Sequence, residues 1–207
     1  MNIAAQRTEK TLQAARESGW SVLVAYGNAW RAEYVRYLTD FACLDGHAVL
    51  IMAGGEMQLH LEHPGDALRA RAEARNVRVV HEEDFLGGVA AAITHVCRRT
   101  GAAQIDAVLP SMLPYGIASR LTTPLNDITA AFDQLMMEKT SLEIEAVRRA
   151  AALADEGYEV FRHAARPGRM EYEVIADVEA FFRRKACPDN FMIMASGGKE
   201  VRAMHPP

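Results

Sequence analysis

Up to about residue 135, short apolar runs of strand length alternate with longer segments whose apolar residues follow helical spacing. Apolar runs of about four to eight residues between turn residues are typical of buried strands, and strands interleaved with helices indicate an α/β layer fold. The segments expected to form strands are residues 21–26, 35–39, 48–52, 57–61, 76–80 and 105–109, and those expected to form helices are residues 3–17, 66–75 and 85–100. The pattern predicts a sheet that helices cover on at least one face.

Two adjacent glycines, Gly54 and Gly55, separate two of the predicted strands. A glycine pair between apolar runs favours a tight hairpin turn, because both turn positions need positive φ angles. A hairpin makes its two strands antiparallel, whereas helical crossovers make strands parallel. We therefore expect a mixed sheet in an α/β domain that spans residues 1–135.

From Thr140 onward the pattern becomes helical. Thr140 and Glu143 have the spacing of a capping box, which satisfies backbone donors at the start of a helix. Apolar residues then recur in steps of three and four at Ile144, Val147, Ala151, Ala154, Tyr158, Phe161 and Ala165, before Pro167 and Gly168. This spacing predicts a long helix with one apolar stripe.

A second helix is expected over residues 171–185 and a strand over residues 191–196. Two helices and one strand cannot enclose a core of their own. We therefore expect residues 136–207 to form the opening part of a second domain whose remaining elements lie outside this sequence.

The charge balance and the distribution of apolar residues exclude several classes of protein. The 207 residues include 23 Lys and Arg against 27 Asp and Glu, a net charge of −4, so no nucleic-acid partner is expected. No apolar run approaches the roughly 20 residues of a membrane helix, and the charged N-terminus lacks the apolar segment of a signal peptide. Cys43, Cys97 and Cys187 are widely spaced and odd in number, which favours reduced thiols in a cytoplasmic protein.

The motif His60-Leu61-Glu62-His63 contains two imidazoles three residues apart. On a helix this spacing can bind a metal ion, but the surrounding residues predict a strand that leads into a turn, where the two side chains point in opposite directions. We interpret both histidines as surface polar residues at a strand end. A small metal enzyme that uses His60, His63 and His81 is the alternative.

Other motifs fail on their spacing. The cysteines are too far apart for a zinc site, and the His-x-Glu and Pro-Cys-x-x-Cys pair of zinc deaminases is absent. Gly198-Lys199 is followed by Glu200 instead of Ser or Thr, so it is no phosphate-binding loop. Ser196 lacks the preceding glycine of a nucleophile elbow.

His205 follows the last predicted strand and a Gly-Gly loop, and it precedes Pro206 and Pro207. The prolines hold the backbone extended, and a histidine on a stiff loop can donate or accept a proton near neutral pH. Taken alone, His205 is best explained as a surface histidine.

Three stretches together resemble the family of creatinase, prolidase and aminopeptidase P. The first is YGN at residues 26–28 with VRYLTDF at residues 35–41, which is similar to the N-x-x-Y-L-T-x-F segment of the creatinase N-terminal domain. The second is LMMEKTSLEI at residues 135–144 with RRA at residues 148–150, which resembles the junction with the pita-bread catalytic domain. The third is RPGRMEYE at residues 166–173, followed by ASG at residues 195–197 and by His205. Met170 stands where the family has a helix-capping threonine.

The resemblance implies a creatinase-like N-terminal domain over residues 1–135 and the first helices and strand of an α+β pita-bread domain over residues 136–207. In the family's peptidases, two aspartates, one histidine and two glutamates hold two divalent ions, Mn, Co or Zn, whereas creatinase-type members use no metal. All five ligands lie beyond the equivalent of His205, so the chain is expected to hold no metal residue and no cofactor. By its place after the first pita-bread strand, His205 matches a histidine that assists proton transfer or contacts substrate.

The resemblance therefore implies the N-terminal part of a hydrolase that breaks a C–N bond in a small peptide or a small amide or guanidine-type substrate. The family's N-terminal domain helps to form a homodimer and walls off the neighbouring active site. The chain alone is expected to be inactive, without membrane or nucleic-acid partners. The alternative is a stand-alone α/β binding or dimerisation module without catalysis.

Overall fold

The computed structural model describes residues 2–187 and 192–197. The chain divides into two compact units, Met1–Thr140 and Ser141–Pro207, which we call the N-terminal unit and the C-terminal unit. Within the described residues, no helix is both long enough and apolar enough to cross a membrane.

A six-stranded mixed sheet forms the centre of the N-terminal unit, counted over the residues that the structure describes. Its strands are β1 (Leu23–Asn28), β2 (His47–Ala53), β3 (Glu56–Leu61), β4 (Arg78–His81), β5 (Ile105–Val108) and β6 (Leu125–Asp127), in the order β4-β3-β2-β1-β5-β6. Strand β2 is antiparallel to both β1 and β3, and the other neighbours are parallel. Gly54 and Gly55, both at positive φ, connect β2 to β3. The predicted mixed sheet and its hairpin are confirmed.

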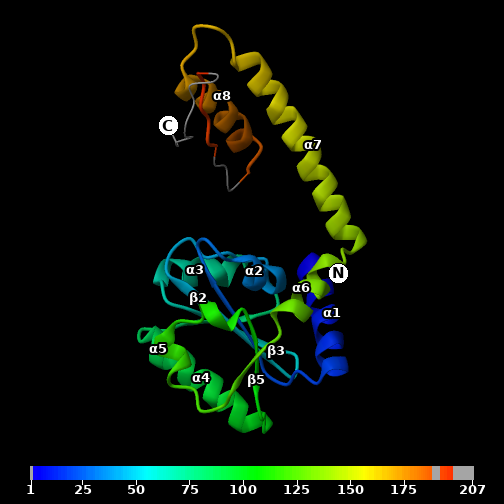
Figure 1. Cartoon of the computed structure of the whole chain (residues 1–207), viewed down its shortest axis with the longest axis vertical. Helices are drawn as coiled ribbons and strands as arrows, with labels where there is room; N and C mark the ends of the chain where they lie inside the picture. The colour runs from blue at the N-terminus through cyan, green and yellow to red at the C-terminus, as the bar shows by residue number, and fades with distance from the viewer. Residues whose placement is uncertain (1, 188–191, 198–207) are drawn as a thin grey trace. The chain divides into compact units, whose positions relative to one another are not determined.

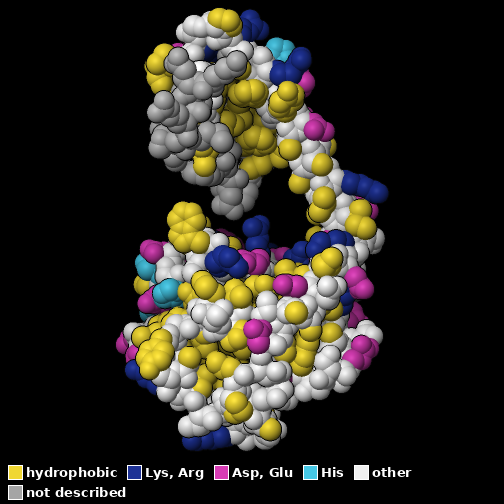
Figure 2. Space-filling view, viewed as in Figure 1, with side chains coloured by type: hydrophobic (Ala, Val, Ile, Leu, Met, Phe, Trp, Pro, Cys, Tyr) yellow, Lys and Arg dark blue, Asp and Glu magenta, His cyan; other side chains and the backbone are white. Residues whose placement is uncertain are grey.

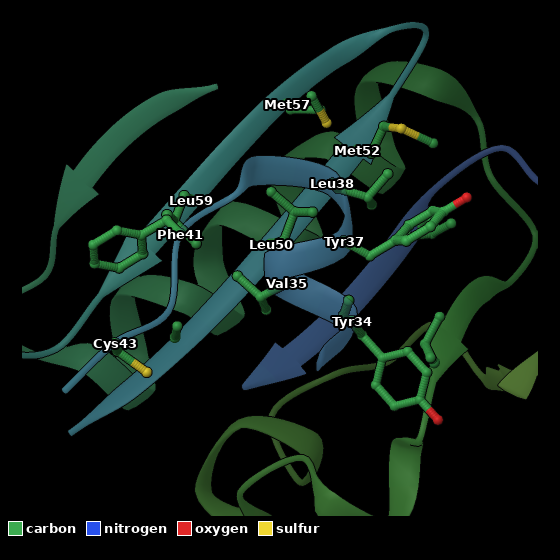
Figure 3. Packing of buried hydrophobic residues seen from close by; sticks show 14 of the residues in the cluster. Tyr34, Val35, Tyr37, Leu38, Phe41, Cys43, Leu50, Met52, Met57 and Leu59 are labelled. Atoms are coloured by element: carbon green, nitrogen blue, oxygen red, sulfur yellow. The ribbon is translucent and has the colours of Figure 1, made fainter. Parts of the chain in front are cut away.

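Helices cover both faces of this sheet (Figure 1). They are α1 (Ile3–Ser18), α2 (Glu33–Thr39), α3 (Pro64–Glu73), α4 (Phe85–Thr100), α5 (Tyr115–Ala118) and α6 (Thr129–Met137), with a 3₁₀ turn η1 (Pro110–Met112). Side chains of α2, α3 and α6 join the buried cluster on one face, and those of α4 and α5 join the cluster on the other. Figure 3 shows Val35 and Leu38 of α2 packed beside Leu50 of β2.

The helices α1 and α4 begin and end at the residues that physical chemistry favours. The side chains of Asn2 and Asp84 accept hydrogen bonds from the first-turn N–H groups of α1 and α4. Gly19 and Gly101 end these two helices in the left-handed conformation, which glycine adopts without a steric cost. These signals explain why the sequence located both helices to within one residue.

The predicted strand over residues 35–39 is wrong, because these residues belong to helix α2. Tyr34, Val35 and Leu38 are buried while Arg36 is exposed, which is the three-and-four spacing of a helix face. Asp40 then ends the helix in the left-handed conformation. The run is rich in aromatic and β-branched residues, so its composition resembles a strand although its burial pattern is helical.

The C-terminal unit contains α7 (Ser141–Ala164) and α8 (Glu171–Arg184). The two helices pack through a glycine: a Cβ atom on Gly157 of α7 would overlap the ring of Phe182 on α8. The predicted apolar stripe of α7 is not the face that α8 covers. Val147 and Tyr158 of that stripe are 60% and 61% exposed, whereas Gly157 and Ala164 are buried.

The strand expected over residues 191–196 falls partly outside the described residues. Of residues 192–197, which the structure describes, none belongs to a strand, and Met194 forms an isolated bridge. The backbone N–H of Ser196 donates a hydrogen bond to Oε1 of Glu171, the first residue of α8, over 2.5 Å. This contact ties the segment to the first turn of α8.

Candidate functional site

A hydrogen-bond network links β1 and β2 at the end of the sheet where β1 ends and β2 begins. The Asn28 amide donates to the Tyr26 hydroxyl over 3.1 Å, and that hydroxyl lies 2.6 Å from Nδ1 of His47 on β2. Because the hydroxyl oxygen already accepts from Asn28, its own hydrogen is available to His47, and Nδ1 is assigned as the acceptor. This hydrogen-bond network joins Asn28, the last residue of β1, to His47, the first residue of β2.

The same asparagine fixes the turn that follows β1. Its Oδ1 accepts from the backbone N–H groups of Trp30 and Arg31, each over 2.9 Å. Trp30 is 92% exposed on this turn. Tryptophan is enriched among the residues that contribute most of the binding energy at protein interfaces.

His47 is also held from its other side. Its backbone N–H donates to Oε2 of Glu62 over 3.1 Å, and its ring Nε2 lies 4.0 Å from the same oxygen. Phe85, the first residue of α4, stacks on the imidazole with ring centroids 6.0 Å apart. The imidazole is therefore oriented by Tyr26, Glu62 and Phe85 while about two fifths of its side chain remains exposed. Such a group can contact a partner.

Sequence reasoning missed His47 because its partners lie far from it along the chain. Tyr26 and Glu62 are 21 and 15 residues away, and only the pairing of β1, β2 and β3 brings them together. The available signal was the polar residue pair at the end of the first apolar run, Tyr26 and Asn28.

His60 lies on the same face of the sheet but in the interior. Its side chain is 2% exposed, and Nδ1 is 2.7 Å from Oε1 of Glu82. The interpretation of His60 as a surface residue is therefore wrong. Burial lowers the pKa of His60, although the hydrogen bond and charge of Glu82 oppose this shift. Nε2 of His60 is buried and has no hydrogen-bond partner among the described residues.

The other two histidines of the metal hypothesis do not join His60. His63 precedes α3, and its Nδ1 accepts the N–H of Gly65 over 3.2 Å, so it acts as a helix cap. His81 is the last residue of β4. The described part of the chain contains no group of three His, Cys, Asp or Glu side chains that could hold a metal ion.

No family model matches the sequence, and no curated protein matches it. Solved structures do match. An X-Pro aminopeptidase from Thermotoga maritima has a TM-score of 0.71 and 18% identity, over 87% of this chain and 50% of its own. A prolidase from Thermococcus sibiricus (TM-score 0.66, 18% identity) matches over 92% of this chain and 52% of its own. An Xaa-Pro dipeptidase from Bacillus anthracis (TM-score 0.64, 21% identity) matches over 88% of this chain and 49% of its own.

The chain has the fold of the Xaa-Pro peptidases. It spans about half the length of the solved structures that it matches. The resemblance noted in the sequence therefore agrees with the fold.

In this Xaa-Pro peptidase fold, the Tyr-Leu-Thr segment is a structural motif. Tyr37, Leu38 and Thr39 lie in α2 and are at most 4% exposed. The Thr39 hydroxyl donates to the Val35 carbonyl over 2.8 Å and accepts the N–H of Phe41 over 3.2 Å. These hydrogen bonds stabilise the C-terminal end of α2 and the first residues of the segment that leads to β2.

The buried carboxylates of the fold are also structural. Asp106 is fully buried and accepts hydrogen bonds from the Ser21 N–H and from the Gln104 and Asn126 side chains. It thereby joins the starts of β1, β5 and β6. Three donors occupy most of the acceptor positions of this carboxylate, and it has no exposed surface.

The cysteines are free thiols, as expected. Burial raises the pKa of Cys43 to about 11 and also raises the pKa of Cys97. A thiol with a raised pKa is a poor nucleophile and a poor metal ligand at neutral pH. His205, the candidate catalytic residue, lies outside the described residues, so its role stays a prediction.

Proposed function

We propose that this chain is the N-terminal part of a hydrolase that cleaves the C–N bond of a small Xaa-Pro peptide. The observation that carries the proposal is the match to three Xaa-Pro peptidases, each over about nine tenths of this chain and about half of its own length. The creatinase-like sequence segments support it independently. The C-terminal unit is then the opening of a pita-bread domain, and the protein is cytoplasmic.

The chain alone is proposed to be inactive. Its described residues do not fit a pair of divalent ions, because no three ligand side chains converge and His60 and His63 are engaged by Glu82 and Gly65. The ligands of a metal-dependent parent would have to come from other residues. His205 would then contribute proton transfer or a substrate contact.

The proposed assembly is a homodimer in which the N-terminal unit walls off the neighbouring active site. The turn with Trp30 supports this assignment, since an exposed tryptophan on a hydrogen-bonded turn is suited to a contact surface. The wall would admit small peptides and exclude long chains.

Activity assays can test the proposal directly. The purified 207-residue chain is expected to release no proline from Ala-Pro with Mn²⁺ or Co²⁺, because the hydrolytic centre is missing. The same chain extended with the sequence that follows Pro207 in its reading frame is expected to release proline. Metal-dependent cleavage by the short chain, or no cleavage by the extended chain, contradicts the proposal.

A stand-alone binding or dimerisation module is the second candidate, and the exposed stripe on α7 favours it. Figure 2 shows hydrophobic side chains along α7, and Ile144, Val147 and Tyr158 are each at least 40% exposed. An exposed apolar stripe of this kind marks a surface that another protein segment buries. Sedimentation at two concentrations tests this reading: a concentration-dependent increase in mass supports it, and a strict monomer contradicts it.

A further inference from the structure

The N-terminal unit contains a cavity whose lining residues play no part in the argument for the proposed function. It has a volume of about 270 Å³ and lies between α1, the start of β1 and the β2–β3 hairpin. Its walls come from rigid elements: Leu12 of α1, Leu23 of β1 and Met52 of β2 line it. Figure 3 labels Met52 at the hairpin end of the sheet. Ligand sites are typically concave, mostly apolar and preformed in this way.

The chemistry of the lining is asymmetric. Leu23 and Met52 are almost fully buried, and Trp20 adds an aromatic surface. Among the described residues that line the cavity, Arg16 is the only charged one. The cavity therefore combines apolar walls with a single positive charge.

Arg16 is exposed and, like several other arginines such as Arg36 and Arg71, forms no ion pair with a described residue, but it is the arginine that lines this cavity. Arg7, Arg31 and Arg99 each form an ion pair. An unpaired guanidinium beside an apolar cavity is complementary to a carboxylate that carries an apolar body, because guanidinium binds carboxylate in a fixed, two-pronged geometry.

The hairpin turn contributes no side chains to the cavity. Gly55 has a positive φ, which disfavours a side chain at this position, and a Cβ atom there would lie 3.9 Å from the methyl groups of Leu12. Gly54 and Gly55 also line it. The turn that forms the hairpin thus leaves room for a ligand.

We propose that this cavity binds a small monocarboxylate with an apolar or aromatic body, with Arg16 contacting the carboxylate and Leu12 and Trp20 contacting the body. The site lies within the N-terminal unit, so the proposal stands whether or not the parent protein is a hydrolase.

The probe is phenylacetate, and phenylacetamide is its neutral counterpart. The readout is the indole N–H signal of Trp20 in ¹⁵N-labelled full chain, which the Trp30→Phe variant identifies because the chain has 2 tryptophans. Phenylacetate is expected to shift the Trp20 signal saturably at up to about 10 mM, in the range of weak small-ligand binding. The Trp30 signal is expected to stay in place.

Variants separate the carboxylate contact from general charge effects. Arg16→Gln is expected to weaken phenylacetate binding about tenfold, in line with the loss of one charge-assisted hydrogen bond. Arg71→Gln, which removes an exposed charge on α3, is expected to leave binding unchanged. Equal binding of phenylacetamide, an equal loss with Arg71→Gln, or no saturable shift of Trp20 overturns the proposal.

Discussion

The Glu82 carboxylate, at the end of β4, binds the buried imidazole of His60 on the neighbouring strand, with Oε1 2.7 Å from Nδ1. Its other oxygen lies against Gly88 in the first turn of α4, where a Cβ atom would overlap it. The pair therefore connects the interior of the sheet to the start of α4. Glycine at position 88 is required for this close approach.

Stability is expected to fall as the pH drops below about 6.5, in part because of His60. Burial lowers the pKa of His60 in the folded chain, so below the ordinary histidine pKa the unfolded chain binds a proton that the folded chain does not. Urea unfolding at several pH values measures the effect, which is at most about 1.4 kcal/mol per pH unit for one group.

The variant His60→Leu isolates this contribution. It is expected to reduce the loss of unfolding free energy between pH 7 and pH 5, relative to the unchanged chain, by up to about 1 kcal/mol. His63→Asn, at an exposed helix cap, is the matched control. An identical pH dependence with and without His60 would contradict the assignment.

Gly157→Ala is expected to destabilise the C-terminal unit by about 1–2 kcal/mol. The new methyl group would overlap the ring of Phe182, and this overpacking outweighs the gain of about 1 kcal/mol in helix propensity. Guanidinium unfolding followed by circular dichroism measures the change. Asp155→Ala, on an exposed part of α7, is the control and is expected to be neutral or slightly stabilising. A stabilising Gly157→Ala would show that α7 and α8 do not pack closely.

Met170→Thr is expected to stabilise α8 by about 1 kcal/mol. Met170 occupies the cap position with extended backbone angles, and Glu173 already accepts its backbone N–H over 2.8 Å. A threonine hydroxyl would supply the missing half of the capping box. The melting temperature measures the effect, with Met170→Ala as the control. Equal melting temperatures for the Thr and Ala variants would refute the expectation.

Thr39→Val is expected to cost about 1–3 kcal/mol of unfolding free energy. The substitution keeps the side-chain shape but removes the hydroxyl that serves Val35 and Phe41, and it leaves the buried Phe41 N–H without its partner. Urea unfolding gives the value. Thr94→Val, whose hydroxyl donates to the Ala90 carbonyl on α4 and accepts no N–H, is the control and should cost less. Comparable losses for both variants would argue against a special role of Thr39.

Local signals were enough where each residue's neighbours in sequence decide its conformation. The apolar runs around Gly54 and Gly55 predicted a hairpin, and glycine tolerance of positive φ made that prediction firm. Gly19 and Gly101 fixed two helix ends for the same reason. The short elements η1, α5 and β6 had no such signal, because three or four residues cannot display a period.

Residues 35–39 show where local signals fail. Their composition favours a strand, yet the sheet position beside β1 is taken by β2 and β5, and the segment packs on the sheet face as α2. The exposed stripe of α7 is a second case. The apolar spacing predicted the helix correctly, but the face that packs against α8 is set by Gly157, where the Phe182 ring lies so close that a Cβ atom would overlap it.

The sequence by itself determined the alternation of strands and helices, the hairpin and the resemblance to Xaa-Pro peptidases, because these depend on composition and spacing along the chain. The tertiary structure alone decided which polar groups meet. His47 reaches Tyr26 and Glu62, and His60 reaches Glu82, only because strand pairing places residues from separate segments side by side. The same assembly formed the Arg16 cavity, since its walls come from three elements whose contact no local pattern encodes.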